Sequence, residues 1–239
     1  MWESEIDLTT QDGTMNTFVV RPDEGEHPLI AFLMDAPGKR EELHDMARRL
    51  AGAGYYVMLP NLYYRRVREF VSGADKREEM FAHMNSLTNA MVCQDIEVLV
   101  KHAEADAHAS VSRIGCVGYC MSGPFAFAAA AHLSDRVAAA ASLHGVRLCS
   151  EAPDSPHRDA GRVQGELYFG CAESDEWAPP EMIERLDAAL AAAGARYRIE
   201  WYPGTQHGFV FPQREAMYHH EAAERHWDRL LDLFGRNLR

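Results

Sequence analysis

The sequence has little positive charge and no long apolar run, and each absence excludes a class of protein. Its 24 Lys and Arg residues stand against 36 Asp and Glu, which gives a net charge of −12. An acidic balance argues against binding to nucleic acid or to an anionic membrane surface. No stretch approaches the ~18 apolar residues that would span a bilayer. We therefore predict no nucleic-acid partner and no membrane association.

The cysteines and the first residues indicate a reducing compartment. The five cysteines are an odd number and form no Cys-x-x-Cys pair, which excludes a disulfide framework and is typical of a cytoplasmic protein. Residues 1–5 carry two acids and no basic residue, so we expect no signal peptide. No close spacing of His, Cys and Asp indicates a metal site, and we predict neither a metal nor a cofactor.

What is present is typical of a globular protein. The chain is 47% hydrophobic and 25% charged, both ordinary fractions for a folded domain. Its 239 residues suit one large α/β domain or two small ones. Because there is no internal repeat, low-complexity tract or long linker, we interpret residues 1–239 as a single domain.

Hydrophobic periodicity predicts the class of fold. Two segments that can extend flank the turn signal Asp12-Gly13 and predict an N-terminal antiparallel hairpin over residues 5–20. From residue 29 onward, short apolar runs alternate with helical periodicity. We expect strands at 29–34, 55–59, 112–118, 137–143, 167–171 and 197–202, and helices at 41–53, 75–84, 91–105, 124–133, 179–193 and 215–234. This alternation predicts a mostly parallel sheet with helices on both faces.

The segment Gly118-Tyr-Cys120-Met-Ser122 carries the most chemical information. It joins a predicted strand directly to a predicted helix, with a cysteine at the corner and small residues on both sides. That pattern is typical of the nucleophile elbow of α/β-hydrolases. The elbow would expose the sulfur of Cys120 at a helix N-terminus and place the Met121 amide to stabilise an oxyanion. The alternative is a buried structural cysteine at a strand–helix junction.

Two further residues have the positions that a base and an acid would need. Asp175 follows the strand predicted at 167–171, and His207 follows the strand predicted at 197–202. The order nucleophile, acid, base is that of the α/β-hydrolases, and ligands bind at the carboxyl ends of parallel strands. Alternatively, Asp175 only caps the next helix. His207, one of the twelve histidines of the chain, would then lie in a solvated loop without a catalytic role.

These residues resemble the dienelactone hydrolase family, from residue 29 to the last helix. The marks of the resemblance are residues 118–123, Gly170, Asp175, Pro179, residues 207–209, and residues 54–63. It implies an α/β-hydrolase fold and a lactone or ester hydrolase with a triad of Cys120, His207 and Asp175. It also implies that the Ala36 amide is a second oxyanion donor. Asp35 stands beside the nucleophile, where the family often has Glu.

The resemblance also predicts a substrate cleft, with differences from the family. Dienelactone hydrolases hold the substrate carboxylate with two arginines. Arg77 matches the first, but Phe211 stands at the second, four residues past the histidine. We therefore expect an apolar cleft with one cation, lined by Arg77, Phe81, Met84, Trp177 and Phe211. Losing one charge-assisted contact costs roughly 1.5–3 kcal/mol, so dienelactone itself is not expected to be the preferred substrate.

The sequence thus predicts a hydrolase that cleaves a small ester or lactone through a thioester, as a monomer or small homo-oligomer. Two alternatives stay open, because fold does not guarantee activity. One is a ligand-binding protein with a vestigial triad. The other is a redox sensor that uses Cys120.

Overall fold

Eight strands form one sheet in the order β1-β2-β4-β3-β5-β6-β7-β8, and the structure, a computed structural model, describes residues 1–239. β1 and β2 are antiparallel, as are β2 and β4, and every other neighbouring pair is parallel. The N-terminal hairpin and the mostly parallel sheet are therefore confirmed. The strands are β1 (Trp2–Thr10), β2 (Gly13–Arg21), β3 (His27–Leu33), β4 (Tyr56–Pro60), β5 (Ala109–Tyr119), β6 (Val137–Leu143), β7 (Glu166–Ser174) and β8 (Arg196–Gln206).

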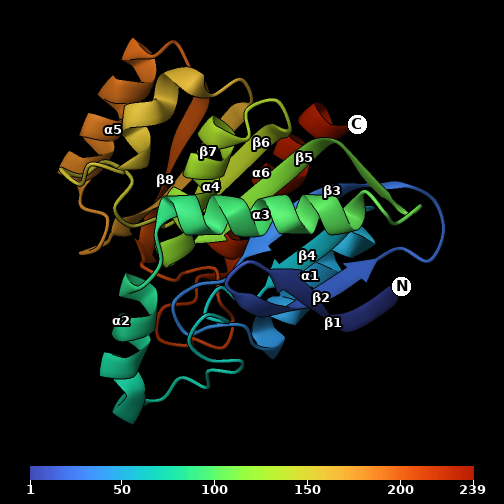
Figure 1. Ribbon diagram of the computed structural model, residues 1–239. Helices are drawn as coiled ribbons and strands as arrows, with labels where there is room; N and C mark the ends of the chain where they lie inside the picture. The colour runs from blue at the N-terminus through green and yellow to red at the C-terminus, as the bar shows by residue number, and fades with distance from the viewer.

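Helices cover both faces of this sheet. Figure 1 shows α3 and α4 in front of the strands and α6 behind them. The α-helices are α1 (Glu41–Gly52), α2 (Arg77–Asn85), α3 (Asn89–Ala103), α4 (Gly123–His132), α5 (Pro180–Ala192) and α6 (His220–Leu238). Short 3-10 turns are η1 (Ala74–Lys76), η2 (Cys120–Ser122) and η3 (Pro156–Arg162). This arrangement is the α/β-hydrolase fold. None of the helices is long and apolar enough to cross a membrane.

Burial explains why the central segments form these elements. Leu29 to Leu33 in β3 are fully buried, as expected of a strand covered on both faces. Every residue of α4 from Gly123 to Ala131 is buried, so its small side chains let the helix pack closely on the sheet and on α3. These central elements hold the turn between β5 and α4 rigidly.

The last helix differs from the prediction at both ends. It begins at His220 and not near Glu215, because the side chain of His219 accepts a hydrogen bond from the Ala222 amide and caps it. It continues past Phe234 to Leu238, whose side chain is buried against the sheet. The surface loop predicted at 151–165 also contains a short helical turn, η3.

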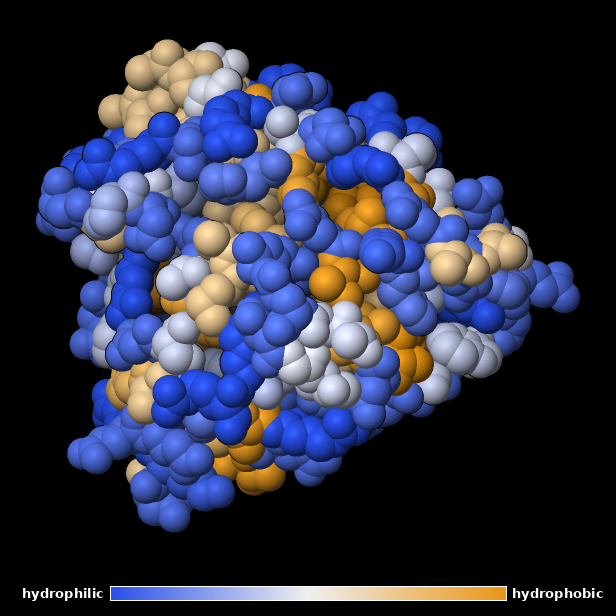
Figure 2. Space-filling model, in the orientation of Figure 1, coloured by the Kyte–Doolittle hydropathy of each residue, from blue (hydrophilic) through white to orange (hydrophobic).

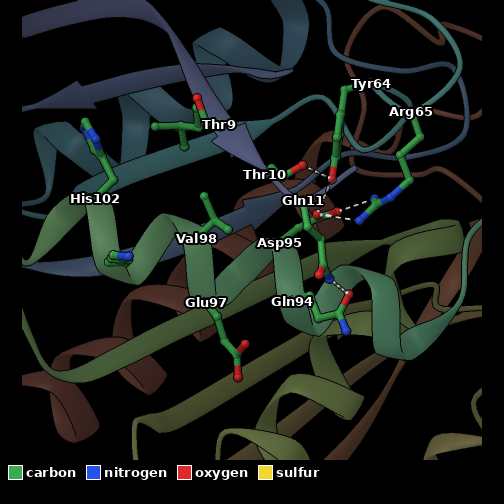
Figure 3. Close-up of a pocket in the computed structure, with 12 residues that line it drawn as sticks. Thr9, Thr10, Gln11, Tyr64, Arg65, Gln94, Asp95, Glu97, Val98 and His102 are labelled. Atoms are coloured by element: carbon green, nitrogen blue, oxygen red, sulfur yellow. Dashed lines mark hydrogen bonds and ion pairs between the residues drawn. The ribbon is translucent and has the colours of Figure 1, made fainter. Parts of the chain in front are cut away.

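A polar cluster around Asp95 ties α3 to the chain that follows β4. The buried Asp95 carboxylate accepts hydrogen bonds from Tyr64 at 2.9 Å and from Arg65 at 2.8 Å (Figure 3). Burial raises the pKa of Asp95, although Arg65 opposes the rise. The cluster borders a hollow of about 650 Å³ that contains no cysteine. Because its acid and base already pair with each other, we interpret this cluster as structural.

Candidate active site

Cys120 lies at a sharp turn between β5 and the helical segment of η2 and α4. Its backbone φ is +55°, a left-handed conformation that is uncommon outside glycine. The hydroxyl of Ser122 accepts a hydrogen bond from the Tyr119 amide at 2.9 Å and donates to the Leu33 carbonyl at 3.1 Å. The Ser122 hydroxyl thus ties the turn to the ends of β5 and β3. The side chain of Cys120 is half-buried and lines a cavity.

Gly118 shows why the turn requires small flanking residues. A Cβ atom at this position would lie 2.1 Å from the carbonyl oxygen of Ser122. Gly118→Ala is therefore expected to force the backbone apart and to lower the free energy of unfolding by about 3 kcal/mol. Urea denaturation would measure this loss, with Gly52→Ala as the control because a Cβ there meets nothing within 4 Å. Equal stability of the two variants would contradict a tight turn.

Asp175 directly follows β7 and His207 directly follows β8, and the two residues meet at the cleft that Cys120 also lines. Asp175 Oδ2 lies 2.7 Å from His207 Nδ1, and its Oδ1 accepts hydrogen bonds from the Trp177 and Ala178 amides at 2.9 and 3.2 Å. Asp175 thus orders the loop before α5 and also orients the imidazole. Burial lowers the pKa of His207, but the hydrogen bond to Asp175 and the interactions with the Asp175 and Cys120 charges outweigh it and raise the pKa to about 10. The imidazolium form is therefore favoured at neutral pH.

The two residues whose amides were predicted as oxyanion donors also lie here. Ala36 lines the same cavity as Cys120, and Met121 is buried immediately after it. The hydroxyl of Tyr63 bridges them, at 2.8 Å from the Ala36 carbonyl oxygen and 3.2 Å from the Met121 sulfur. Sequence reasoning did not single out Tyr63 for this position, because only the fold brings it beneath both residues.

Asp35 is fully buried and is shared by two arginines. Arg40 and Arg214 both hydrogen-bond to its carboxylate, and Arg40 also pairs with Glu42. The cluster of two arginines and two carboxylates is neutral overall. Because Arg40 and Arg214 compensate the charge of Asp35, that carboxylate does not stand as an isolated anion beside the thiol.

The cleft in front of Cys120 and His207 has a volume of about 710 Å³. Four of the residues predicted for it do line it, namely Arg77, Phe81, Met84 and Trp177. The rings of Phe81 and Trp177 approach to 6.0 Å between centroids. The side on view in Figure 2 is mostly hydrophilic, with apolar residues in separate patches. No broad apolar surface covers this side.

Phe211 and the charge of the cleft differ from the prediction. Phe211 is fully buried and does not line the cavity, because its ring packs beneath Arg214, with the guanidinium carbon 4.3 Å from the ring centroid. Arg214 itself lines the cavity, and so does Arg147. The cleft therefore contains three arginines, and the prediction of a single cation is wrong. Gapless counting from His207 missed Arg214, which lies seven residues past the histidine.

His144 is a second neighbour that sequence reasoning did not place in the site. Its ring is fully buried, with its centroid 4.8 Å from that of His207, and neither of its nitrogens has a hydrogen-bond partner. Burial, with the charges of His207 and Arg214, lowers the pKa of His144 well below its ordinary value. A neutral imidazole therefore packs against His207. Across the molecule, no group of three or more His, Cys, Asp or Glu side chains is placed to hold a metal ion.

Comparison with known proteins identifies the family. Residues 15–238 match the model of the dienelactone hydrolase family. The chain belongs to the dienelactone hydrolase family. Among similar proteins, a "Putative carboxymethylenebutenolidase" of Methylorubrum extorquens is 29% identical over 96% of this chain and 79% of the relative. A protein of the same name from Synechocystis sp. is 26% identical over 90% of this chain and 88% of the relative.

Solved structures agree with this membership. A structure titled as that of a "Putative Dienelactone Hydrolase" from Klebsiella pneumoniae has a TM-score of 0.88 and 26% identity, and the match covers 98% of both chains. A dienelactone hydrolase-family fold thus extends over almost the whole of this chain, from the hairpin to α6.

Proposed function

We propose that this protein hydrolyses a small carboxylic ester or lactone through Cys120, His207 and Asp175, by way of a thioester. The observation that supports this proposal is the grouping of these three residues at the cleft. The Asp175 carboxylate holds one nitrogen of His207 at 2.7 Å, and Cys120 lines the same cleft as this imidazole and contributes to the raised pKa of His207. A nucleophile, a base and an orienting acid in this order are what acyl transfer requires.

The first step follows from the raised pKa of His207. In the proposed mechanism its imidazole takes the proton of the Cys120 thiol and leaves a thiolate beside an imidazolium. Helix α4 begins just beyond Cys120, and its N-terminal dipole also favours the anion. The thiolate attacks the acyl carbon and forms the first tetrahedral oxyanion. The amides of Met121 and Ala36 stabilise that oxyanion.

Two proton transfers complete the cycle. The tetrahedral intermediate collapses to a thioester, and the leaving alkoxide takes the proton from the His207 imidazolium. In a lactone this alkoxide stays attached through the acyl chain. The neutral imidazole then removes a proton from water, whose oxygen attacks the thioester. The second collapse releases the carboxylic acid and restores the thiolate and imidazolium.

Charge in the cleft supports an anionic substrate. The protein carries a net charge of −12 and exerts no long-range attraction on an anion. Three arginines nevertheless line the cleft around Cys120, against one carboxylate, that of Glu176. The proposal of a substrate preference altered from dienelactone itself therefore rests on the additional cation Arg147, and not on a missing arginine.

The thiol can be tested directly against the two alternatives. We expect iodoacetamide to alkylate one cysteine per chain rapidly at pH 7, with Cys120 as the site, because the four other thiols are buried. Peptide mass mapping of labelled protein, with turnover of p-nitrophenyl acetate followed in parallel, would measure this. Slow labelling spread over several cysteines, with no turnover, would favour a ligand-binding role. Redox sensing would need a resolving thiol, and no other cysteine lines the cleft.

A further inference from the structure

Two of the arginines that line the cleft have no carboxylate partner. Arg214 shares Asp35 with Arg40, but neither Arg77 nor Arg147 takes part in an ion pair. Arg77 lies over the ring of Phe81, with its guanidinium carbon 5.6 Å from the ring centroid. Arg147 instead hydrogen-bonds to a neutral group: its Nη2 donates to the Asn85 side-chain oxygen at 3.0 Å. Both cations are therefore available to an anionic ligand.

The length of α2 separates the two cations, because Arg77 lies at one end of this helix and Arg147 contacts the other end. Arg77 is the first residue of α2, and Asn85, to which Arg147 is bound, is the last. A rise of 1.5 Å per residue over these eight steps places the two ends of the helix about 12 Å apart. Phe81 and Met84 lie between them in the sequence of α2 and line the same cleft as Cys120 and His207. The cleft thus has a cation at each end of one apolar wall.

Arg147 is also held close to the nucleophile by the backbone. The Val146 amide donates to the Cys120 carbonyl at 3.1 Å, which attaches the loop after β6 to the turn that carries the thiol. Arg147 follows with a φ of +54°, so its backbone is in the left-handed region and not in the extended conformation of β6. A guanidinium is suited to bidentate contact with a carboxylate, and an exposed arginine without an acidic partner is free to make one.

We propose that the substrate is an ester or lactone with two carboxylates, one bound near Arg77 and Arg214 and the other bound by Arg147. This inference rests on the proposed function and specifies its substrate class. The reacting carbonyl lies between the two acids, and the apolar residues of α2 contact the carbon chain. Glu176 also lines the cleft, so the two arginines without a carboxylate partner, Arg77 and Arg147, exceed this acid by one.

The competing explanation is structural: the contact between Arg147 and Asn85 fixes the end of α2. Both groups are exposed, so this single contact is worth little on its own. The two roles can be separated because one partner can be changed without the other. Asn85→Ala removes the contact but keeps the cation. Arg147→Asn removes the cation and suits the left-handed backbone, and Arg147→Lys keeps the charge without the planar fork.

The substrates should differ only in their charged ends. Phenyl hexanoate has no acid, phenyl hydrogen adipate has one on the acyl side, 4-carboxyphenyl hexanoate has one on the leaving group, and 4-carboxyphenyl hydrogen adipate has both. We expect the wild-type kcat/KM to be at least about tenfold higher for the diacid than for either monoacid, which corresponds to ~1.4 kcal/mol. In Arg147→Asn, the loss on the diacid should exceed the loss on phenyl hexanoate about tenfold, mainly through KM.

The controls decide between the roles. Asn85→Ala should keep the preference for the diacid, and Arg147→Lys should keep part of it. If Arg147→Asn and Asn85→Ala lower kcat/KM equally on all four esters, the structural role is correct and the proposal is overturned. It is also overturned if Arg147→Asn leaves the diacid preference intact.

A binding measurement distinguishes failure of this inference from failure of the proposed hydrolysis. The amide N-(4-carboxyphenyl)adipamic acid has both acids but resists cleavage. Titration calorimetry should give a Kd that rises about tenfold in Arg147→Asn. Loss of turnover on every ester with this Kd difference retained would overturn the hydrolase and keep the dianion site. Turnover of the esters without any Kd difference between wild type and Arg147→Asn would keep the hydrolase and overturn the dianion site.

Discussion

Cys120→Ala is expected to lower the kcat/KM for phenyl acetate by at least ~10⁴-fold, because the proposed acyl intermediate forms on the Cys120 sulfur. The fold should survive this change. Alanine keeps the Cβ atom, so the cost of the left-handed backbone at residue 120 stays the same. A spectrophotometric assay with matched urea denaturation curves would measure both effects.

Cys120→Ser is the graded companion to this variant. A serine hydroxyl is a far weaker acid than a thiol and therefore relies more fully on His207 as a base. We expect activity between that of wild type and that of the alanine variant. Wild-type rates in Cys120→Ala would sink the proposed mechanism, because the thioester could then play no part.

Asp175→Asn is expected to reduce kcat/KM by ~10²–10⁴-fold and to shift its pH dependence. An asparagine amide can present an N–H to His207 Nδ1 and so favours the wrong tautomer. Its oxygen can still accept the Trp177 and Ala178 amides, so the loop before α5 should keep its shape. The variant therefore tests the orientation and charge of the imidazole separately from local folding.

The direction of the pH shift follows from the pKa of His207. Hydrogen bonding to Asp175 raises the pKa of this imidazole, so wild-type kcat/KM should fall as the pH rises through about 10, where His207 loses the proton it gives to the leaving group. Without the carboxylate, this alkaline limb should move toward the ordinary histidine value near 6.5. A full pH profile of both proteins would measure it. An unchanged limb with unchanged activity would contradict the role of Asp175.

The sequence was sufficient to predict the fold and the meeting of three distant residues. Strand–helix alternation is a local signal, and the carboxyl ends of parallel strands necessarily lie on one edge of the sheet. Cys120, Asp175 and His207 each directly follow or closely follow such an end, so their proximity required no knowledge of loop paths. The start of α6 was less predictable, because the cap at His219 depends on one side-chain hydrogen bond.

The walls of the cleft could not be predicted in the same way. Arg214 reaches Asp35 only because the chain after His207 folds back, and counting residues without gaps assigned that position to Phe211. His144 looked like one histidine among twelve, yet β6 delivers its ring against His207. Such positions depend on the course of irregular segments, for which spacing in the sequence carries little information.

The shared carboxylate of Asp35 gives the two sides of the site different freedom to move. Residues 35–40, which include Ala36, and the stretch from His207 to Arg214 are fastened to one another through this buried acid. Pulling either stretch away would strand an uncompensated charge in the interior, at a cost of several kcal/mol. We therefore expect this part of the cleft wall to keep its shape during turnover. Exchange of reactant and product then relies on the rest of the cleft, which includes the 44% exposed side chain of Trp177, whose ring centroid lies 6.0 Å from that of Phe81.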